Sequence, residues 1–299
     1  MRNIKILTDS CSDLNGELLE KYNIDYARMN TVRDGVETEA SLTWEHYSPK
    51  ELYDIMRGGN RITTTQVPAP EFMRIFTKYL EEGFDIIYIG CSLKQSGSVN
   101  TGRIVANGLL KNFPGARIEC IDAKRASLGE GILAIYAAEC LQAGDDYDTI
   151  VSKVLGKRNN VNQFVTVNTL EWLRKAGRVK GSAAFFGNLM GVKPILIADA
   201  DGEQTPIKKV KGRAVSFTTL ADSLNEVIDN PSEATVYVAH ADITDAELEV
   251  LKKLIKEKIN PKEIVISYIG PIIGASIGPD AVGIWGFGKE VTYRISEVN

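Results

Sequence analysis

The chain begins with the apolar run Ile4-Lys5-Ile6-Leu7-Thr8, which passes directly into the polar turn Asp9-Ser10-Cys11-Ser12-Asp13. The apolar run is typical of a buried parallel strand, and the turn is of the kind that connects a strand to a helix. We expect that helix to begin at Asp13-Leu14 and to reach about Tyr22. A strand, a turn and a helix in this order indicate an α/β fold.

Three further polar turns lie between predicted strands and helices. They are Thr63-Thr64-Thr65-Gln66, Gln95-Ser96-Gly97-Ser98 and Ser127-Leu128-Gly129-Glu130-Gly131. Strands are predicted at 85–91 and 117–122, and helices after Pro70, after Gly97 and at about 128–142. In an open parallel sheet such turns share one edge, where unpaired N–H groups of helix N-termini favour an anion. We therefore predict a Rossmann-like sheet flanked by helices, with a carboxylate or phosphate site at that edge.

The pattern changes near residue 158. Asp201-Gly202 between two apolar runs predicts a hairpin. Further strands are predicted at 162–167, 234–239, 264–268 and 282–287, and helices at 169–176, 215–229 and 244–258, the last with the capping box Thr244-x-x-Glu247. We therefore predict two domains: residues 1–158, and an α+β domain at 159–299 with a mostly antiparallel sheet. Residues 30–60 are expected to be irregular, apart from a short helix at 49–56.

Composition excludes several functional classes. The chain has 44% hydrophobic and 25% charged residues and a net charge of 35 − 39 = −4, which gives no basic surface for nucleic acid. No apolar run is long enough to span a membrane, and the N-terminus does not resemble a signal peptide. The four cysteines show no paired spacing. We therefore expect a cytoplasmic protein with free thiols and no metal site.

Hydroxyl groups before two predicted helices are the candidate anion ligands. They belong to Thr64, Thr65 and Ser96, and the backbone of Gly97 adds an N–H group. The alternative is that these residues only cap helices, which is common for Ser and Thr. Arg178 could bind a carboxylate through two parallel hydrogen bonds. The alternative is that it forms a surface salt bridge or interacts with the C-terminal end of the helix that precedes it.

The segment from Gly270 to Pro279 combines three glycines and two prolines with an apolar stretch that includes Ile277. We interpret it as a loop that approaches a ligand closely; the alternative is a plain connection between strands. An apolar loop beside polar groups suits a ligand with a charged head and an apolar tail.

Most catalytic interpretations find little support. There is no Walker motif, and Gly129-x-Gly131-x-x-Ala134 matches the dinucleotide fingerprint only weakly. His46 and His240 are expected to be surface or capping residues, and Asp9 and Asp122 to cap helices rather than hold magnesium. We expect no cofactor and no catalytic residues.

The ordered set of motifs resembles the DegV family of bacterial fatty-acid-binding proteins over nearly the whole chain. Asp9-Ser10-Cys11-Ser12-Asp13-Leu14 resembles the family's D-S-x-S-D-L, Thr64-Thr65-Gln66-Val67-Pro68 its T-S-Q-P-S, and Gln95-Ser96-Gly97-Ser98 its L-S-G-T. Asp122-Ala123-Lys124 with Ser127-x-Gly129-x-Gly131, and Thr169-Leu170-Glu171-Trp172-Leu173 with Ala176-Gly177-Arg178, also fit. In the closing segment, Ser276 stands where the family pattern has histidine, and Asp280 where it has glycine.

The resemblance implies a two-domain carrier that buries a long acyl chain, largely in a pocket of the second domain, and holds its carboxylate between the domains. If the family's head-group residues are transferred to the matching positions of this chain, they are Thr64, Ser96 and Arg178. Ser276 replaces the family's histidine and can donate a hydrogen bond, but it cannot become cationic. It also implies a possible partner, a separate ATP-binding kinase subunit that makes an acyl-phosphate, and at most transient contact with a membrane.

Two other interpretations stay open. One is an enzyme that acts on a phosphorylated or carboxylated metabolite at the same edge, with Asp9, Asp122 or His240 as base or metal ligand. The other is a sensor whose ligand state is detected by another protein.

Overall fold

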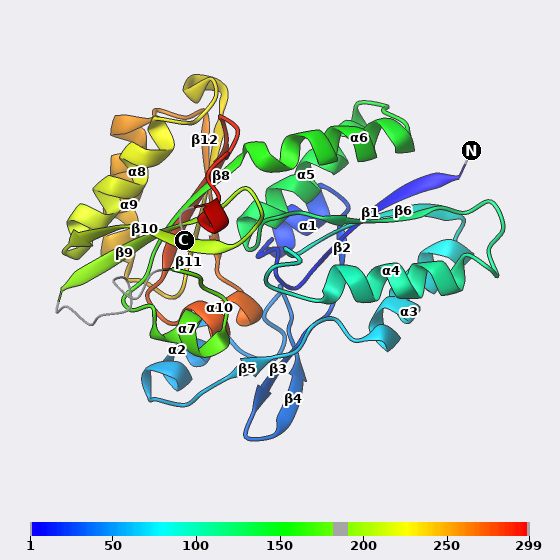
Figure 1. Cartoon of the computed structure of the whole chain (residues 1–299), viewed down its shortest axis with the longest axis horizontal. Helices are drawn as coiled ribbons and strands as arrows, with labels where there is room; N and C mark the ends of the chain where they lie inside the picture. The colour runs from blue at the N-terminus through cyan, green and yellow to red at the C-terminus, as the bar shows by residue number, and fades with distance from the viewer. Residues whose placement is uncertain (1, 182–190, 298–299) are drawn as a thin grey trace.

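The structure is a computed structural model that describes residues 2–181 and 191–297. Its N-terminal part contains a parallel sheet in the order β2-β1-β6-β7. These strands are β1 (Asn3–Asp9), β2 (Asp25–Ala27), β6 (Phe84–Gly90) and β7 (Ile118–Asp122). Helices α3 (Ala69–Glu81) and α4 (Ser98–Leu109) cover one face, and α1 (Gly16–Lys21), α5 (Leu128–Gln142) and α6 (Tyr147–Lys157) lie on the other (Figure 1). The predicted Rossmann-like sheet is confirmed, although α6 was not predicted.

The C-terminal part contains a larger sheet in the order β10-β9-β8-β13-β11-β12. Its strands are β8 (Val161–Thr166), β9 (Val192–Ala198), β10 (Gln204–Lys211), β11 (Thr235–His240), β12 (Glu263–Tyr268) and β13 (Val282–Phe287). Only the β11–β12 pair is parallel. Helices α8 (Arg213–Asn225) and α9 (Asp245–Lys258) pack on one face. The mostly antiparallel sheet, the hairpin at Asp201-Gly202 and the Thr244 capping box are confirmed.

Helix α5 lies between the two sheets and joins their cores. It contacts β1 and β6 on one side and β8, β11 and β13 on the other. Because neighbours lie on both sides, the helix is apolar around most of its circumference, with Ile132, Leu133, Ala134 and Ile135 all buried. One continuous apolar core therefore extends across both sheets.

A small antiparallel sheet corrects the expectation that residues 30–60 are irregular. It has the order β4-β3-β5, with β3 (Asn30–Arg33), β4 (Val36–Glu39) and β5 (Thr63–Thr64). Asp34 and Gly35 connect β3 to β4 with φ values of 52° and 79°. Two consecutive positive φ values match the twist of a tight hairpin, and Asp-Gly is a favoured pair for that turn.

The segment 270–279 was predicted to be a loop, and this was wrong. Pro271–Ile277 forms a short helix, α10, that contacts β3, β5, α2 (Pro49–Arg57) and α7 (Glu171–Ala176) (Figure 1). Short 3₁₀ helices lie at Arg158–Asn160, Pro231–Glu233 and Ile295–Glu297. Across residues 2–181 and 191–297, no helix has the length and apolar character needed to cross a bilayer.

Candidate functional site

A cavity with an empty volume of about 970 Å³, partly open to solvent, lies among elements from both halves of the chain. All of the residues predicted to bind a ligand line it: Thr64, Thr65, Ser96, Gly97, Arg178, Ser276 and Ile277. They come from β5 and the turn after it, the turn before α4, the segment after α7, and α10. Segments far apart in the sequence therefore meet around one space.

Thr64 and Thr65 belong to the segment that connects β5 to α3. The backbone N–H of Thr65 donates to the carbonyl oxygen of Asn30 over 2.9 Å, which fixes this segment against β3. The hydroxyl of Thr65 is buried and has no partner among the described residues. Helix α3 begins after Pro68, without a side-chain cap. The alternative that these threonines serve only as helix caps is therefore wrong.

Ser96 lies in the turn between β6 and α4, and its hydroxyl is fixed by Ser98. The two side-chain oxygens are 2.9 Å apart, and the Ser98 N–H donates to the Ser96 oxygen over 3.2 Å. The Ser98 oxygen in turn accepts from the N–H of Val67 at 3.1 Å. Ser96 therefore accepts from the first N–H group of α4, which agrees with a capping role, while Ser98 connects the start of α4 with the β5–α3 segment beside the cavity.

Gly97 lies directly against the end of the Gln66 side chain. A Cβ atom at position 97 would lie 2.1 Å from Oε1 of Gln66. The amide nitrogen of that glutamine donates to the hydroxyl of Thr101 in α4 over 2.7 Å. The missing side chain at Gly97 therefore lets Gln66 cross the start of α4 at the cavity wall.

Arg178 follows Gly177, which ends α7 in the left-handed conformation. Its Nε donates to the carbonyl oxygen of Gln95 over 2.8 Å, and Nη1 donates to the carbonyl oxygen of Ala176. Within the described residues it forms no ion pair with an acidic side chain, so the surface salt bridge considered from the sequence is wrong. The other alternative is confirmed, because Ala176 is the last residue of α7 and Arg178 donates to its carbonyl oxygen. The guanidinium group connects α7 to the β6–α4 turn and lies in the lining of the cavity.

A second cavity, of about 560 Å³, shares Thr64, Arg178 and Ser276 with the first. Arg61 and Lys175 also line it, so positive charge surrounds the shared residues. Asp280, which stands where the family pattern has glycine, lines neither of these two cavities.

The carboxylate of Asp280 is occupied by other side chains. It accepts from Arg57 over 2.6 Å and from Asn168 over 2.8 Å. Arg57 also pairs with Asp54 and Asp242, so it compensates the charge of Asp280 only in part, outside the lining of the two cavities.

The rest of the large cavity is mainly apolar. Its lining includes Val165, Leu173, Leu196, Ile269, Ile272, Ile273 and Trp285. The sequence reasoning missed two polar residues in it, Gln163 and Gln204, whose side chains share a hydrogen bond of 2.8 Å. The alternation along β8 could have placed Gln163 on the same face as Val165.

Asp13 connects the parallel sheet with the region around α10. Its Oδ1 accepts from the N–H of Gly270 over 2.8 Å, and its Oδ2 accepts from the hydroxyl of Ser127, which lines the cavity. The hydroxyl of Ser267 donates to the Asp13 carbonyl oxygen over 2.7 Å. Complete burial raises the pKa of the Asp13 carboxyl to about 7.

The three candidates for a catalytic base or metal ligand lie outside the cavity lining, and the roles expected for them were wrong. Asp9 is buried and accepts from the Tyr88 hydroxyl and from two backbone N–H groups, rather than capping a helix. Asp122 accepts from backbone N–H groups in two loops. His240 is a buried residue of β11, 4% exposed, and burial lowers its pKa.

Comparisons with known proteins agree with this architecture. The model of the DegV family of uncharacterised proteins matches residues 3–288. A DegV domain-containing protein of Clostridium perfringens is 33% identical over 288 residues, which cover 96% of this chain and 98% of the relative. A DegV domain-containing protein of Staphylococcus aureus is 28% identical over 291 residues, covering 96% and 98% of the two chains.

Solved structures show the same fold. A fatty-acid-binding DegV family protein of Thermus thermophilus aligns with a TM-score of 0.85 and 25% identity, over 97% of this chain and 100% of that one. A DegV lipid-binding protein of Thermotoga maritima aligns with a TM-score of 0.83 and 26% identity, over 97% and 100% of the two chains. With a family match over nearly its whole length and a relative above 30% identity, the chain belongs to the DegV family.

Proposed function

We propose that this protein binds a long-chain fatty acid as a carrier, without catalytic residues or a cofactor for that role. The observation that carries the proposal is one cavity in which hydroxyl groups and an arginine meet a mainly apolar lining. Such a lining suits an acyl chain, because each buried CH₂ group contributes about 0.8 kcal/mol. The fatty-acid-binding DegV relative supports the same ligand class.

In this proposal the carboxylate accepts hydrogen bonds from Thr64, Thr65, Ser96 and Ser276, and Arg178 adds a positive charge. The buried Thr65 hydroxyl, which lacks a partner among the described residues, supports this placement. The backbone of Gly97 and the side chain of Ile277 complete the wall around the head and the first part of the chain. The ligand would lie between a domain at residues 1–158 and a domain at residues 159–299, the second of which supplies most of the acyl-chain pocket.

We also propose that the carrier works in the cytoplasm and presents the carboxylate to a separate ATP-binding kinase subunit. The smaller cavity supports this, because Arg61 and Lys175 would attract a phosphoryl group towards a carboxylate held at Thr64 and Ser276. Acyl-phosphate formation would then use the kinase's catalytic groups, while this protein supplies binding and orientation.

The test is native mass spectrometry of the freshly purified protein, followed by denaturing extraction and lipid analysis. We expect a complex with one long-chain fatty acid per chain, and its mass gives the chain length and saturation. A ligand-free protein that also fails to bind added fatty acids would contradict the proposal.

The kinase step has its own test. Acyl-phosphate should form only when a fatty acid kinase subunit, ATP and the loaded carrier are combined. Metal-dependent turnover by this protein alone would favour the enzyme alternative instead.

A further inference from the structure

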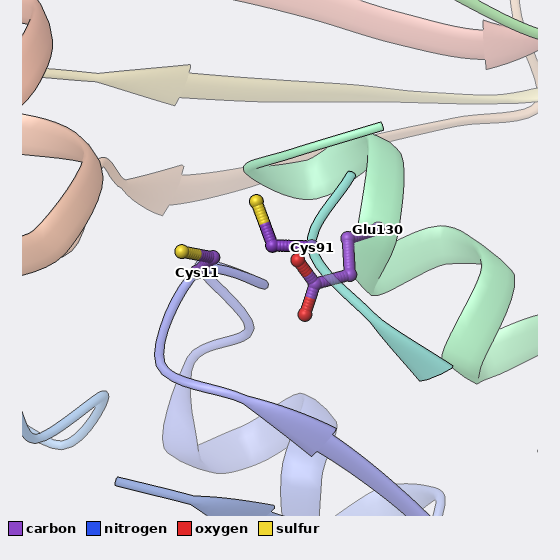
Figure 2. A group of neighbouring side chains, drawn as sticks. All are labelled: Cys11, Cys91 and Glu130. Atoms are coloured by element: carbon purple, nitrogen blue, oxygen red, sulfur yellow. The ribbon is translucent and has the colours of Figure 1, made fainter. Parts of the chain in front are cut away.

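Cys11, Cys91 and Glu130 meet where β1, β6 and α5 come together. Their two sulfur atoms and a carboxylate oxygen lie within 4.8 Å of one another. Figure 2 shows that the cysteines follow the ends of two strands, while Glu130 comes from the first turn of the helix. The side chains are almost fully buried, with 3%, 2% and 0% of each residue exposed. Sequence spacing alone predicted no metal site, because these residues are far apart in the chain.

Neighbouring groups hold all three residues in place. The Asp9 carboxylate accepts from the N–H of Cys11 over 2.9 Å and from the N–H of Cys91 over 3.3 Å. Tyr88 fixes that carboxylate through a hydrogen bond of 2.6 Å. Such outer contacts orient metal ligands in proteins.

Glu130 has one occupied and one free carboxylate oxygen. Its Oε1 accepts from the Thr8 hydroxyl over 2.7 Å. Its Oε2 is buried and has no hydrogen-bond partner among the described residues. A buried carboxylate oxygen without a partner is costly, so it points to a missing cation or donor.

We propose that Cys11, Cys91 and Glu130 bind a zinc ion. Two thiolates and a carboxylate are ligands that zinc accepts, whereas magnesium and calcium prefer oxygen alone. Binding releases the protons of these groups, and the deprotonated set would carry a charge of −3, of which the divalent ion compensates two. Zinc favours four ligands, so one position stays open.

The large cavity supplies the access route and the open position. Cys11 and Cys91 both line it, and so does Met29, whose sulfur lies 3.5 Å from that of Cys11. A bound ion would connect the ends of two adjacent strands to the start of α5. This proposal does not depend on the identity of the lipid ligand.

The test uses the whole protein, purified under reducing conditions, treated with a chelator and kept free of oxygen. Cobalt(II) titration should give the thiolate-to-cobalt charge-transfer band in the near ultraviolet, saturating at one ion per chain. Zinc should then abolish the band by displacing cobalt. A titration without this band would overturn the proposal.

Variants assign the ligands. C11S/C91S should lose the band. Glu130→Gln removes one ligand but keeps both thiolates, so it should keep a band and bind cobalt more weakly by at least the roughly 10-fold that loss of an outer partner costs. The matched control is C120S/C140S, which removes the other two buried, free thiols and should leave the titration unchanged. Equal loss of the band in both double variants would contradict the assignment.

A second measurement needs no variant. Alkylation followed by peptide mapping should show that zinc protects Cys11 and Cys91 but not Cys120 and Cys140. If Cys11 and Cys91 instead form a disulfide under air and zinc gives no protection after reduction, the pair is a redox couple and the metal proposal fails.

Discussion

At the residue scale, Ser96 is held in position before any ligand arrives. Its oxygen is fixed by Ser98 beside the cavity, so binding a carboxylate requires little further ordering of the side chain. We expect Ser96→Ala to weaken fatty acid binding by about 1–3 kcal/mol, the usual loss for a hydrogen bond to a charged group. Isothermal titration with a long-chain fatty acid measures this.

The matched control for Ser96 is Ser152→Ala, an exposed serine in α6 far from the cavity lining. It should leave the affinity unchanged. If wild type and Ser96→Ala bound the fatty acid with equal affinity, Ser96 would not contact the carboxylate as proposed.

Ser276 lies between the two cavities, beside Thr64 and Arg178 in the lining of both. Ser276→His would introduce a group that titrates near pH 6.5 and is cationic below that pH. We therefore expect the variant to bind a fatty acid more tightly at pH 6 than at pH 8, by about 10-fold or less. Titrations at both pH values on the variant and the wild type measure the difference, and an identical pH response in the two proteins would contradict it.

At the scale of elements, the start of α4 carries a contact between Gly97 and the side chain of Gln66 that one methyl group at position 97 would displace. Gly97 has a φ of −82°, which alanine tolerates, but its Cβ would meet Gln66. Gly97→Ala should displace Gln66, break its hydrogen bond to Thr101 and lower the free energy of unfolding by about 1 kcal/mol. Urea denaturation measures this change.

Gly108 in the same helix provides the control, because a Cβ there meets nothing within 4 Å. Gly108→Ala should raise the free energy of unfolding by up to about 1 kcal/mol, since alanine favours helix more than glycine does. If both variants changed stability in the same direction, the contact between Gly97 and Gln66 would not explain the effect.

Elements with strong local signals could be predicted, and short elements were missed. The capping box at Thr244 predicted the start of α9, and the Asp201-Gly202 turn predicted the hairpin of β9 and β10. The structure confirms both elements. The same Asp-Gly signal at Asp34-Gly35 was overlooked, because the strands beside it are only four residues long and partly polar. Helix α10 also has a signal, proline at its first position and glycine after its end, but seven residues are too few for a clear periodic pattern.

At the scale of the whole molecule, the sequence predicted both sheets and part of the cavity lining, but not how the sheets meet. Helix α5 is apolar on nearly every side, which indicates that it is buried. This pattern does not identify the two sheets between which the helix lies. The contacts of Cys11 with Cys91 and Glu130, and of Gln163 with Gln204, depend on that packing. Spacing along one chain does not contain this information.

Asp13 gives the contact between the two sheets a dependence on pH. Its carboxyl has an ordinary pKa of 3.8 and a pKa of about 7 in the folded protein, because burial raises the pKa by more than the hydrogen bonds from Ser127 and Gly270 lower it. The folded state therefore retains this proton between pH 4 and pH 7 while the unfolded state loses it. Stability from this group falls as pH rises through that window, by at most about 4 kcal/mol.

Asp13→Asn isolates this effect, because the amide keeps an oxygen for Gly270, can donate to Ser127 and tolerates the φ of 53° at this position. The variant has no proton to lose here, whereas Asp9 and Glu130, whose pKa values burial also raises, titrate in both proteins. The stability difference should therefore shift in favour of Asp13→Asn from pH 4 to pH 7 and stay constant above. Urea denaturation across this range measures it. A stability difference between the two proteins that does not change with pH would mean that Asp13 stays ionised in the folded protein. The hydrogen bonds of Asp13 alone would then have to stabilise a buried charge at the junction of the two sheets.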